Sequence, residues 1–191
     1  MHANIVSNMP DPMKAMRCPF CREPASKKEN RKGLAKRVKA NDPAALCHMG
    51  GKCHDEGDYD GAFEYYTKAA ELGNVDAHYQ LGLMYMEGVG VEEDKERAVY
   101  HFEKAAIGGH PQARHDLARY EGRNGNIERA VKHFIISAKL GNELSMKALW
   151  AEFRNKNIIK EDLDATLRSH QAAINAMKSS ERDAAEVVFR N

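Results

Sequence analysis

The sequence predicts an all-α protein built as a stack of about four antiparallel helix pairs. One pattern recurs in register, with 32, 36 and 32 residues between corresponding first anchors, and a period of about 20–50 residues is typical of a solenoid or array. Small and aromatic residues recur at helical spacing inside each unit. Each unit closes on a glycine that suits a helix end. The first anchors are Ala45, Ala77, Ala113 and Ser145.

The first 40 residues form a basic leader. They hold ten Lys or Arg against three acidic residues, a net charge of +7 in a chain whose total is +1. Four prolines predict an irregular segment over 1–25. Ser26 and Glu29 have capping-box spacing and predict a basic linker helix over 26–40. Paired basic residues there are typical of a nuclear import signal, although a solvated basic helix is the simpler interpretation.

Each unit is predicted to be a helical hairpin. Anchors at +0, +4 and +8 place one stripe about 80° wide on the first helix. Asp42 and Pro43 start the first of these helices, as an N-cap and a first-turn proline. Each second helix follows an Asp or Asn and ends at a glycine. The expected N-caps are Asp58, Asp94 and Asn126, and the closing glycines are Gly73, Gly109 and Gly141.

Residues 143–177 resemble a worn fourth unit. Its expected anchors are Ser145, Leu149 and Phe153 on the first helix and Ala165, Ala172 and Ala173 on the second. Trp150 stands where two earlier units hold glycine, so we expect this unit to pack as a cap. The repeat array then spans 41–178, and a C-terminal capping helix is expected over 179–191.

The recurring pattern is specific enough to suggest a family. It reads A-x-x-x-L-G-x-x-Y, then a G-x-G-V loop with acidic residues, then A-x-x-x-[YF]-x-x-A-A-x-x-G, and it resembles the Sel-1-like repeats, relatives of tetratricopeptide repeats. Residues 76–110 match nearly every position, whereas 44–74 and 112–142 match with a shorter loop. The resemblance implies a right-handed α-solenoid that serves protein–protein interaction and complex assembly, with no chemistry of its own.

One face of the stacked first helices is a candidate partner-binding surface. Positions +2, +6 and +9 lie opposite the packed stripe, on the face that the resemblance implies is concave. The residues chosen there are Tyr79, Leu83, Met86, His115, Arg119 and Lys147. An aromatic residue and a Leu–Met patch beside basic residues suit an amphipathic or acidic peptide. Ordinary surface variation would give the same residues.

The cysteine pair in the leader is the second signal. Cys18-Pro19-Phe20-Cys21 resembles the final ligand pair of a RING finger, a domain that binds two zinc ions and recruits ubiquitin-conjugating enzymes. Two thiolates supply half of a tetrahedral zinc site, and only His2 precedes them as a further ligand. Three interpretations stay open: the tail or relic of a longer RING–solenoid protein, a plain structural pair, or a metal site shared with other residues. We expect no cofactor, and zinc only with a RING segment upstream of Met1.

A second group of cysteines and histidines is a weaker metal candidate. Cys47 and His54 are seven residues apart on one helix, hence about 10 Å apart along its axis, too far for one zinc ion. Cys53 takes the repeat position of Tyr85, which predicts a small buried residue.

Composition excludes several function classes. The near-zero net charge argues against a nucleic-acid protein that works by bulk positive field. No apolar run reaches the ~20 residues of a membrane span, the first residues lack the layout of a secretory signal, and the four cysteines form no regular disulfide framework. We therefore expect an intracellular protein, cytoplasmic or nuclear, with no membrane partner.

The function predicted from these observations is protein or peptide binding. No nucleophile elbow, H-E-x-x-H motif or acid–base set is present, so the chain is not expected to be an enzyme. The sequence predicts an interaction module or scaffold that binds a partner on the solenoid surface. The alternative is the substrate-receptor part of a RING-type ubiquitin ligase whose zinc domain is truncated.

Overall fold

Nine helices and no strand occupy residues 27–177, the part of the chain that the computed structural model describes. The predicted all-α architecture is confirmed there. The helices are α1 (Lys27–Lys39), α2 (Pro43–Asp55), α3 (Tyr59–Glu71), α4 (Val75–Glu87), α5 (Lys95–Ile107), α6 (Pro111–Arg123), α7 (Ile127–Lys139), α8 (Glu143–Arg154) and α9 (Lys160–Met177).

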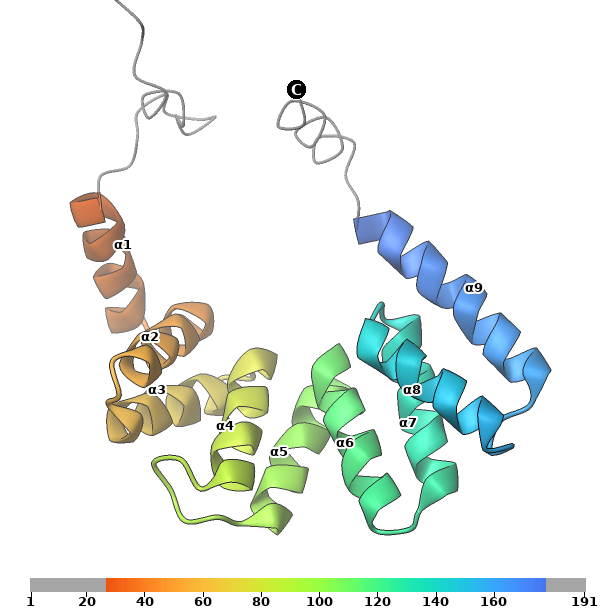
Figure 1. Cartoon of the computed structure of the whole chain (residues 1–191). Coiled ribbons are helices and arrows are strands. Elements are labelled where there is room, and N and C mark those ends of the chain that lie inside the picture. The colour runs from red at the N-terminus through yellow and green to blue at the C-terminus, as the bar shows by residue number, and fades with distance from the viewer. Residues whose placement is uncertain (1–26, 178–191) are drawn as a thin grey trace, which may run out of the picture.

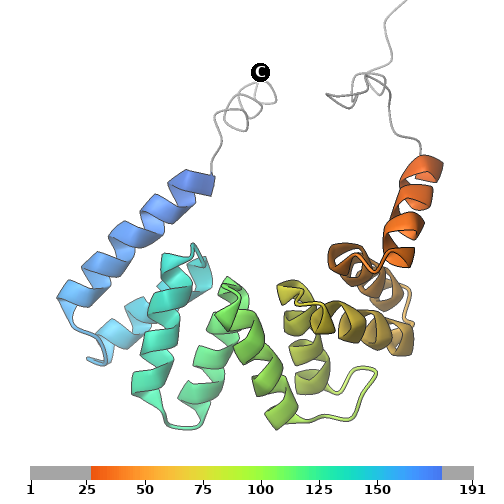
Figure 2. The ribbon, with the colours of Figure 1, turned by 180° about the vertical axis from the view of Figure 1, so that it is seen from behind.

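The helices stack as successive hairpins. α2 packs on α3, α4 on α5 and α6 on α7, and the second helix of each hairpin packs on the first helix of the next. Figure 1 shows the result as a curved array with α1 and α9 as its two arms, and Figure 2 shows the same array from behind. Each hairpin is covered mainly by its neighbours, so the apolar core runs along the array, as in other repeat proteins.

Small residues let the two helices of a hairpin approach closely. Ala77 and Ala98 are fully buried. An added Cβ at Gly82 would lie 2.5 Å from the ring of Phe102, and one at Gly50 would lie 2.7 Å from the ring of Tyr66. The ring of each second helix therefore rests on the backbone of the first, and a larger residue at either glycine would push the helices apart.

Most predicted helix caps are present. The side chains of Asp58 and Asp94 each accept a hydrogen bond from the backbone N–H three residues on, at 3.0 Å. The prediction for Asn126 is wrong in one respect, because its side chain makes no cap bond. Its amide instead donates to the Glu121 carboxylate at 2.8 Å. The Asn126 side chain is thus oriented by its bond to the buried Glu121 carboxylate, and its oxygen accepts no bond from the helix start.

The fourth unit packs differently from the prediction. The buried face of α9 consists of Leu163, Thr166 and His170, whereas Ala172 is exposed and Ala165 and Ala173 are only half-buried. These three alanines are therefore not the anchors of α9. The imidazole Nδ1 of His170 lies 2.8 Å from the carbonyl oxygen of Ala138, which ties α9 to α7 as well as to α8.

The first helix of this unit also lacks the glycine of the first two units. Trp150 stands on α8 at the position of Gly50 and Gly82, where a ring of the second helix lies on the backbone. An indole replaces that glycine, and α9 packs against α7 as well as α8. Trp150 remains 45% exposed and contacts Phe153 edge-on, with ring centroids 6.4 Å apart.

Of the segments predicted at the two ends of the array, only the basic linker helix lies in the described part of the chain. α1 lies in the range expected for the basic linker helix, and Arg37 pairs with Asp42 at 2.8 Å across the turn into α2. The irregular leader over 1–25 and the capping helix over 179–191 lie outside the described residues. No helix within 27–177 is both long enough and apolar enough to cross a membrane.

Candidate partner-binding surface

A groove of about 210 Å³ runs between α4 and α6. Phe102 of α5, only 1% exposed, forms its floor. Its walls carry both apolar and charged side chains. They are Leu83, Met86 and Glu87 from α4 and Asp116, Arg119, Tyr120 and Arg123 from α6. The groove therefore offers an apolar surface flanked by charged groups from both helices, two acidic and two basic.

Three of the six residues chosen from the sequence line this groove. Leu83 and Met86 are half-buried and pack against the core of the second repeat. Arg119 is exposed on the facing helix, and its guanidinium lies 3.4 Å from the Asp116 carboxylate. Positions +6 and +9 thus come together as the repeat pattern predicts.

Tyr79 belongs to the joint between hairpins. Its hydroxyl donates to the Asp116 carboxylate at 3.2 Å, and its ring stacks on His110 with centroids 4.3 Å apart. Burial and the neighbouring Asp116 raise the pKa of Tyr79 well above its usual value, so the phenol stays protonated and keeps donating. Tyr79 therefore holds Asp116, and through it Arg119, in place beside the groove.

His115 is an interior residue. It is 7% exposed, and its Nδ1 lies 2.8 Å from the Ser145 hydroxyl. Ser145 donates to Ser137 at 2.8 Å, and Ser137 donates to the carbonyl oxygen of Pro111 at 2.7 Å. Since each hydroxyl has one proton to give, His115 must donate from Nδ1. Burial lowers the pKa of His115, which keeps the ring neutral in this chain of hydrogen bonds.

His115 and Lys147 therefore do not line the groove. A ring enclosed by α6, α7 and α8 cannot contact a partner while the hairpins stay packed, so we leave His115 out of the surface. Lys147 is exposed on α8, but it is not among the residues around this cavity.

Sequence reasoning missed Arg123. It is exposed, lines the groove and has no ion-pair partner within the described part of the chain. Arg119 and Arg123 are four residues apart, so they share a face of α6. That spacing is visible in the sequence and could have identified Arg123.

Of the four cysteines, Cys47 and Cys53 lie in the part of the chain that the structure describes. Cys18 and Cys21 lie outside the described residues. Cys53 is half-buried against the core of the first repeat, in keeping with the apolar role expected from its repeat position. Burial, reinforced by Asp76, raises the pKa of the Cys47 thiol to about 11. Between residues 27 and 177 no group of three or more His, Cys, Asp or Glu is placed to hold a metal ion.

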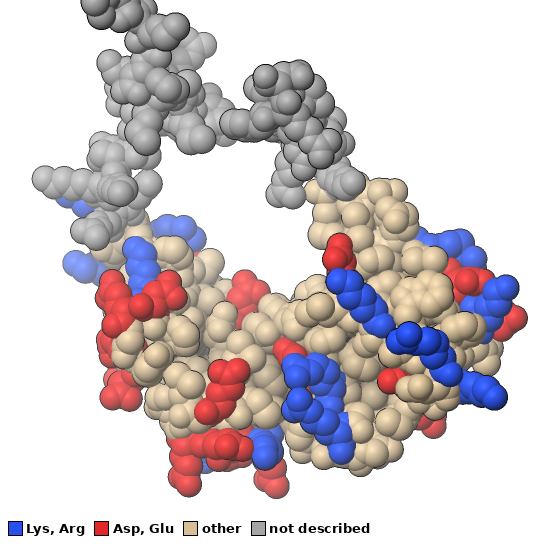
Figure 3. Space-filling model, in the orientation of Figure 1, with Lys and Arg blue, Asp and Glu red and all other residues tan. Residues whose placement is uncertain are grey.

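Charge is distributed unevenly along the array. Residues 43–74 contain six acidic and two basic residues, 75–110 contain seven and three, and 111–142 contain three and six. Figure 3 shows this as acidic side chains over α3, α4 and the loop after α4, and basic side chains over α6 and α8. The α4–α6 groove lies where the sign changes, with its basic wall on α6.

Three consecutive segments of the chain, residues 43–74, 75–110 and 111–142, match the Sel1 repeat. The chain belongs to the Sel1 repeat family. The resemblance inferred from the sequence is thereby confirmed for these three units. Sel1 repeat proteins generally act as scaffolds without catalytic activity and bind protein partners.

Two solved structures are similar to this Sel1 repeat protein in fold. A Sel1 repeat protein from Oxalobacter formigenes superposes with a TM-score of 0.58 at 26% identity and covers 64% of this chain and 98% of its own. The protein c5321, a protective antigen in uropathogenic Escherichia coli strains with an SLR fold, superposes with a TM-score of 0.61 at 26% identity over 77% of this chain and 33% of its own. They confirm the predicted α-solenoid.

A curated relative is similar over a shorter stretch. Chitin synthase regulatory factor 2 from Schizosaccharomyces pombe is 34% identical over 74 residues, which are 39% of this chain and 14% of the relative. The matched region is thus a small part of a much longer protein.

Proposed function

We propose that this Sel1 repeat protein is an interaction module that binds an acidic, partly apolar segment of a protein partner in the α4–α6 groove. The observation that carries the proposal is Arg123, an exposed guanidinium without an ion-pair partner in the described chain, beside the apolar walls formed by Leu83 and Met86. A guanidinium binds a carboxylate through two parallel hydrogen bonds, and a neighbouring apolar surface strengthens them by excluding water.

The groove is held in one geometry before any partner arrives. Asp116 accepts from Tyr79 at 3.2 Å and from Arg119 at 3.4 Å, so both α6 side chains are oriented by α4. Such preorganisation lowers the entropy lost on binding. Arg119 is therefore a positioned group at the edge of the groove, and Arg123 is the group with free hydrogen-bonding capacity.

Affinity capture with the full chain as bait tests the proposal. Arg119→Glu/Arg123→Glu reverses the charge of the basic wall, and Lys139→Glu/Arg168→Glu makes the same charge change at exposed positions on α7 and α9. Partners with acidic segments should be retained by the wild type and the control and reduced at least tenfold with the groove variant. Equal retention by both double variants would exclude this groove as the binding site.

The ubiquitin-ligase alternative depends on Cys18 and Cys21. A substrate receptor would use the same solenoid surface, so the groove does not distinguish the two functions. The distinguishing property is zinc binding by the leader, for which a measurement is given in the Discussion. We favour the scaffold because Sel1 repeats are the family match of this chain and generally bind protein partners.

A further inference from the structure

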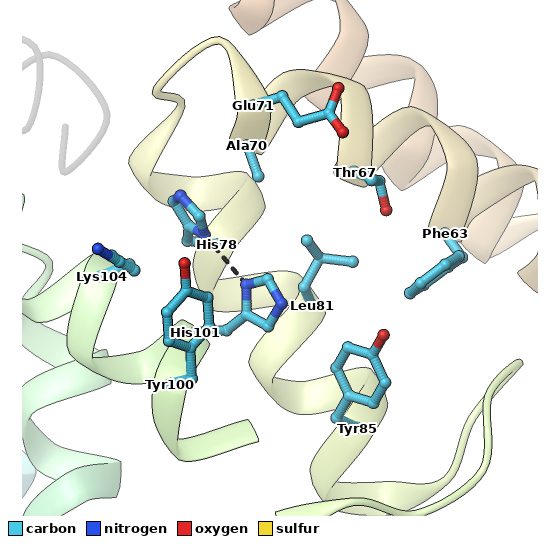
Figure 4. Close-up of a pocket in the computed structure, with 10 residues that line it drawn as sticks. All are labelled: Phe63, Thr67, Ala70, Glu71, His78, Leu81, Tyr85, Tyr100, His101 and Lys104. Carbon is cyan, nitrogen blue, oxygen red and sulfur yellow. Dashed lines mark hydrogen bonds between the residues drawn. The ribbon is translucent and has the colours of Figure 1, made fainter. Parts of the chain in front are cut away.

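A second groove lies on the opposite face of α4. Residues 78, 81 and 85 of α4 point away from 83, 86 and 87 at helical spacing, and they form its floor with α3 and α5 as walls. Two adjoining cavities of about 440 and 490 Å³ make up this α3–α5 groove, and both are lined by Phe63 and Tyr85. Figure 4 shows the first cavity, with His78 and His101 facing each other at its centre.

The interior of the first cavity is aromatic, and the charged residues that line it, Glu71 and Lys104, are exposed. Phe63 meets Tyr85 edge-on with centroids 5.8 Å apart, and Tyr85 lies parallel to His101 at 5.7 Å. The Nδ1 atoms of His78 and His101 are 3.0 Å apart. Burial lowers the pKa of both rings, that of His101 to about 4, so they are neutral at neutral pH. A large apolar side chain would enter this cavity without displacing a charge.

One polar group in the wall has no partner. The Thr67 hydroxyl is buried and makes no hydrogen bond within the described part of the chain. Tyr100, which closes the cavity beside His101, is 52% exposed, and Lys104 lies over its ring at 5.3 Å. The cavity is therefore open on its solvent side, where the exposed ring of Tyr100 is available to a partner.

The second cavity carries three carboxylates and one cation, Arg97, whose guanidinium lies 5.6 Å from the centre of the Tyr85 ring. Asp94 is paired with Arg97 at 3.2 Å and Glu93 with Lys95 at 3.2 Å, both pairs largely exposed. Glu92 is exposed and has no ion pair among the described residues. The two repeats that build the groove hold thirteen acidic and five basic residues in total. A cationic group would therefore be attracted to this end.

We propose that the α3–α5 groove docks a peptide segment of a second partner in which a large apolar residue is followed two positions later by Lys or Arg. In an extended segment, side chains two residues apart point the same way and lie about 7 Å apart. Phe63 and Tyr85 line both cavities, so the cavities adjoin and one such side chain enters each. The cation then reaches Glu92.

This assignment adds to the proposed function and does not depend on it. The α4–α6 groove has a basic wall and the α3–α5 groove an acidic end, on opposite faces of α4. The chain is thereby suited to hold two partners of opposite charge at once, as expected of a scaffold that bridges two proteins.

A peptide titration of the isotopically labelled full chain tests the site through backbone amide chemical shifts. The probes are the blocked peptides Gly-Phe-Gly-Lys-Gly and Gly-Phe-Gly-Glu-Gly. The lysine peptide should produce saturable shifts around Phe63, Tyr85 and His101 at millimolar concentration, and the glutamate peptide should bind at least fivefold more weakly. Absent shifts, equal affinities, or shifts confined to the α4–α6 groove would overturn the assignment.

Two variants distinguish the contribution of the carboxylates in the second cavity from that of the aromatic wall of the first. Glu92→Lys/Glu93→Lys should remove the preference for the lysine peptide, and Tyr100→Ala, at an exposed position, should weaken both peptides. Glu103→Lys is the control for a single charge reversal, because Glu103 is exposed on α5, outside both cavities, and interacts electrostatically with His133 of α7. Arg119→Glu/Arg123→Glu, which changes only the α4–α6 groove, should leave both titrations unchanged. The binding proposed for one groove can therefore be disproved without disproving the binding proposed for the other. An effect of the control equal to that of the Glu92 and Glu93 variant would also overturn the assignment.

Discussion

His78 of α4 and His101 of α5 face each other with their Nδ1 atoms 3.0 Å apart. One of these nitrogens must donate and the other accept, which is possible only while at least one ring is neutral. Burial is the main cause that lowers both pKa values, and the positive charges of Lys104 and Arg97 add to it. The pair therefore links the two helices of the second hairpin at neutral pH, and the link is lost once both rings are protonated.

The folded state should lose stability as the pH falls from about 6.5 to about 4. The histidine pKa of the unfolded chain lies near 6.5, and the pKa of His101 in the folded chain is about 4. Between these values the unfolded chain binds more protons, so stability rises with pH across the window. Because the rings are partly exposed, we expect a loss of about 1–2 kcal/mol from the pair. Urea unfolding followed by circular dichroism at pH 7.5 and 5.0 measures it.

Two variants show whether this loss of stability comes from the His78–His101 pair. His101→Gln should reduce the difference in unfolding free energy between the two pH values, whereas His48→Gln, at an exposed position on α2, should keep the wild-type difference. Burial also lowers the pKa of His110 and His133, so part of the dependence should persist in His101→Gln. An unchanged difference in His101→Gln would show that the pair does not control acid stability.

Gly82→Ala should destabilise the second hairpin by about 1–3 kcal/mol. The added Cβ would lie 2.5 Å from the Phe102 ring, which is 1% exposed, so the ring or the helices would have to shift. Gly122→Ala is the control, because its Cβ would meet the nearest atom, on Ala130, at an ordinary 3.7 Å. This change should be neutral or stabilising, since alanine is the better helix former. Equal urea midpoints for the two variants would contradict the role assigned to the Gly82–Phe102 contact.

Ser145→Ala should cost about 1–3 kcal/mol of unfolding free energy. The Ser145 hydroxyl is fully buried and links His115 to Ser137, so its loss leaves the His115 Nδ1–H without an acceptor. Ser169→Ala removes a hydroxyl that only donates to a carbonyl oxygen of its own helix, and it should change stability by less than about 0.5 kcal/mol. A double-mutant cycle with Ser137→Ala should be non-additive, and strict additivity would show that the three groups do not act as a chain.

The repeat pattern predicted the helices and three of the eight residues that line the α4–α6 groove, because both depend on local spacing. Anchors at +0, +4 and +8 bury the stripe that includes Ala77 and Leu81, and the opposite positions Leu83, Met86 and Arg119 reach the groove. Closing glycines were also predictable, since Gly73 takes a φ of +82° and Gly109 one of +88°, a backbone conformation that favours glycine.

The remaining site residues depend on contacts between units, which a single helix pattern does not contain. A helical wheel with one buried stripe places Tyr79 and His115 on the exposed face. However, each first helix is also covered by the neighbouring hairpins. The +2 row lies at that second contact, where Tyr79 meets Asp116 and His115 meets Ser145, thirty residues further along the chain. The register of α9 was missed for the same reason, because α9 is buried against α7 as well as α8.

Purified full-length chain should contain no stoichiometric zinc. Cys18 and Cys21 supply two thiolates, and a structural zinc site is closed by four ligands. Elemental analysis after chelator-free purification measures the metal, and EDTA should leave the thermal unfolding midpoint unchanged because the core of residues 43–177 contains no ligand cluster. Cys18→Ser/Cys21→Ser should behave like the wild type. One equivalent of zinc that disappears in this variant would instead mean that other residues complete the site, and it would favour the ubiquitin-ligase alternative over the scaffold.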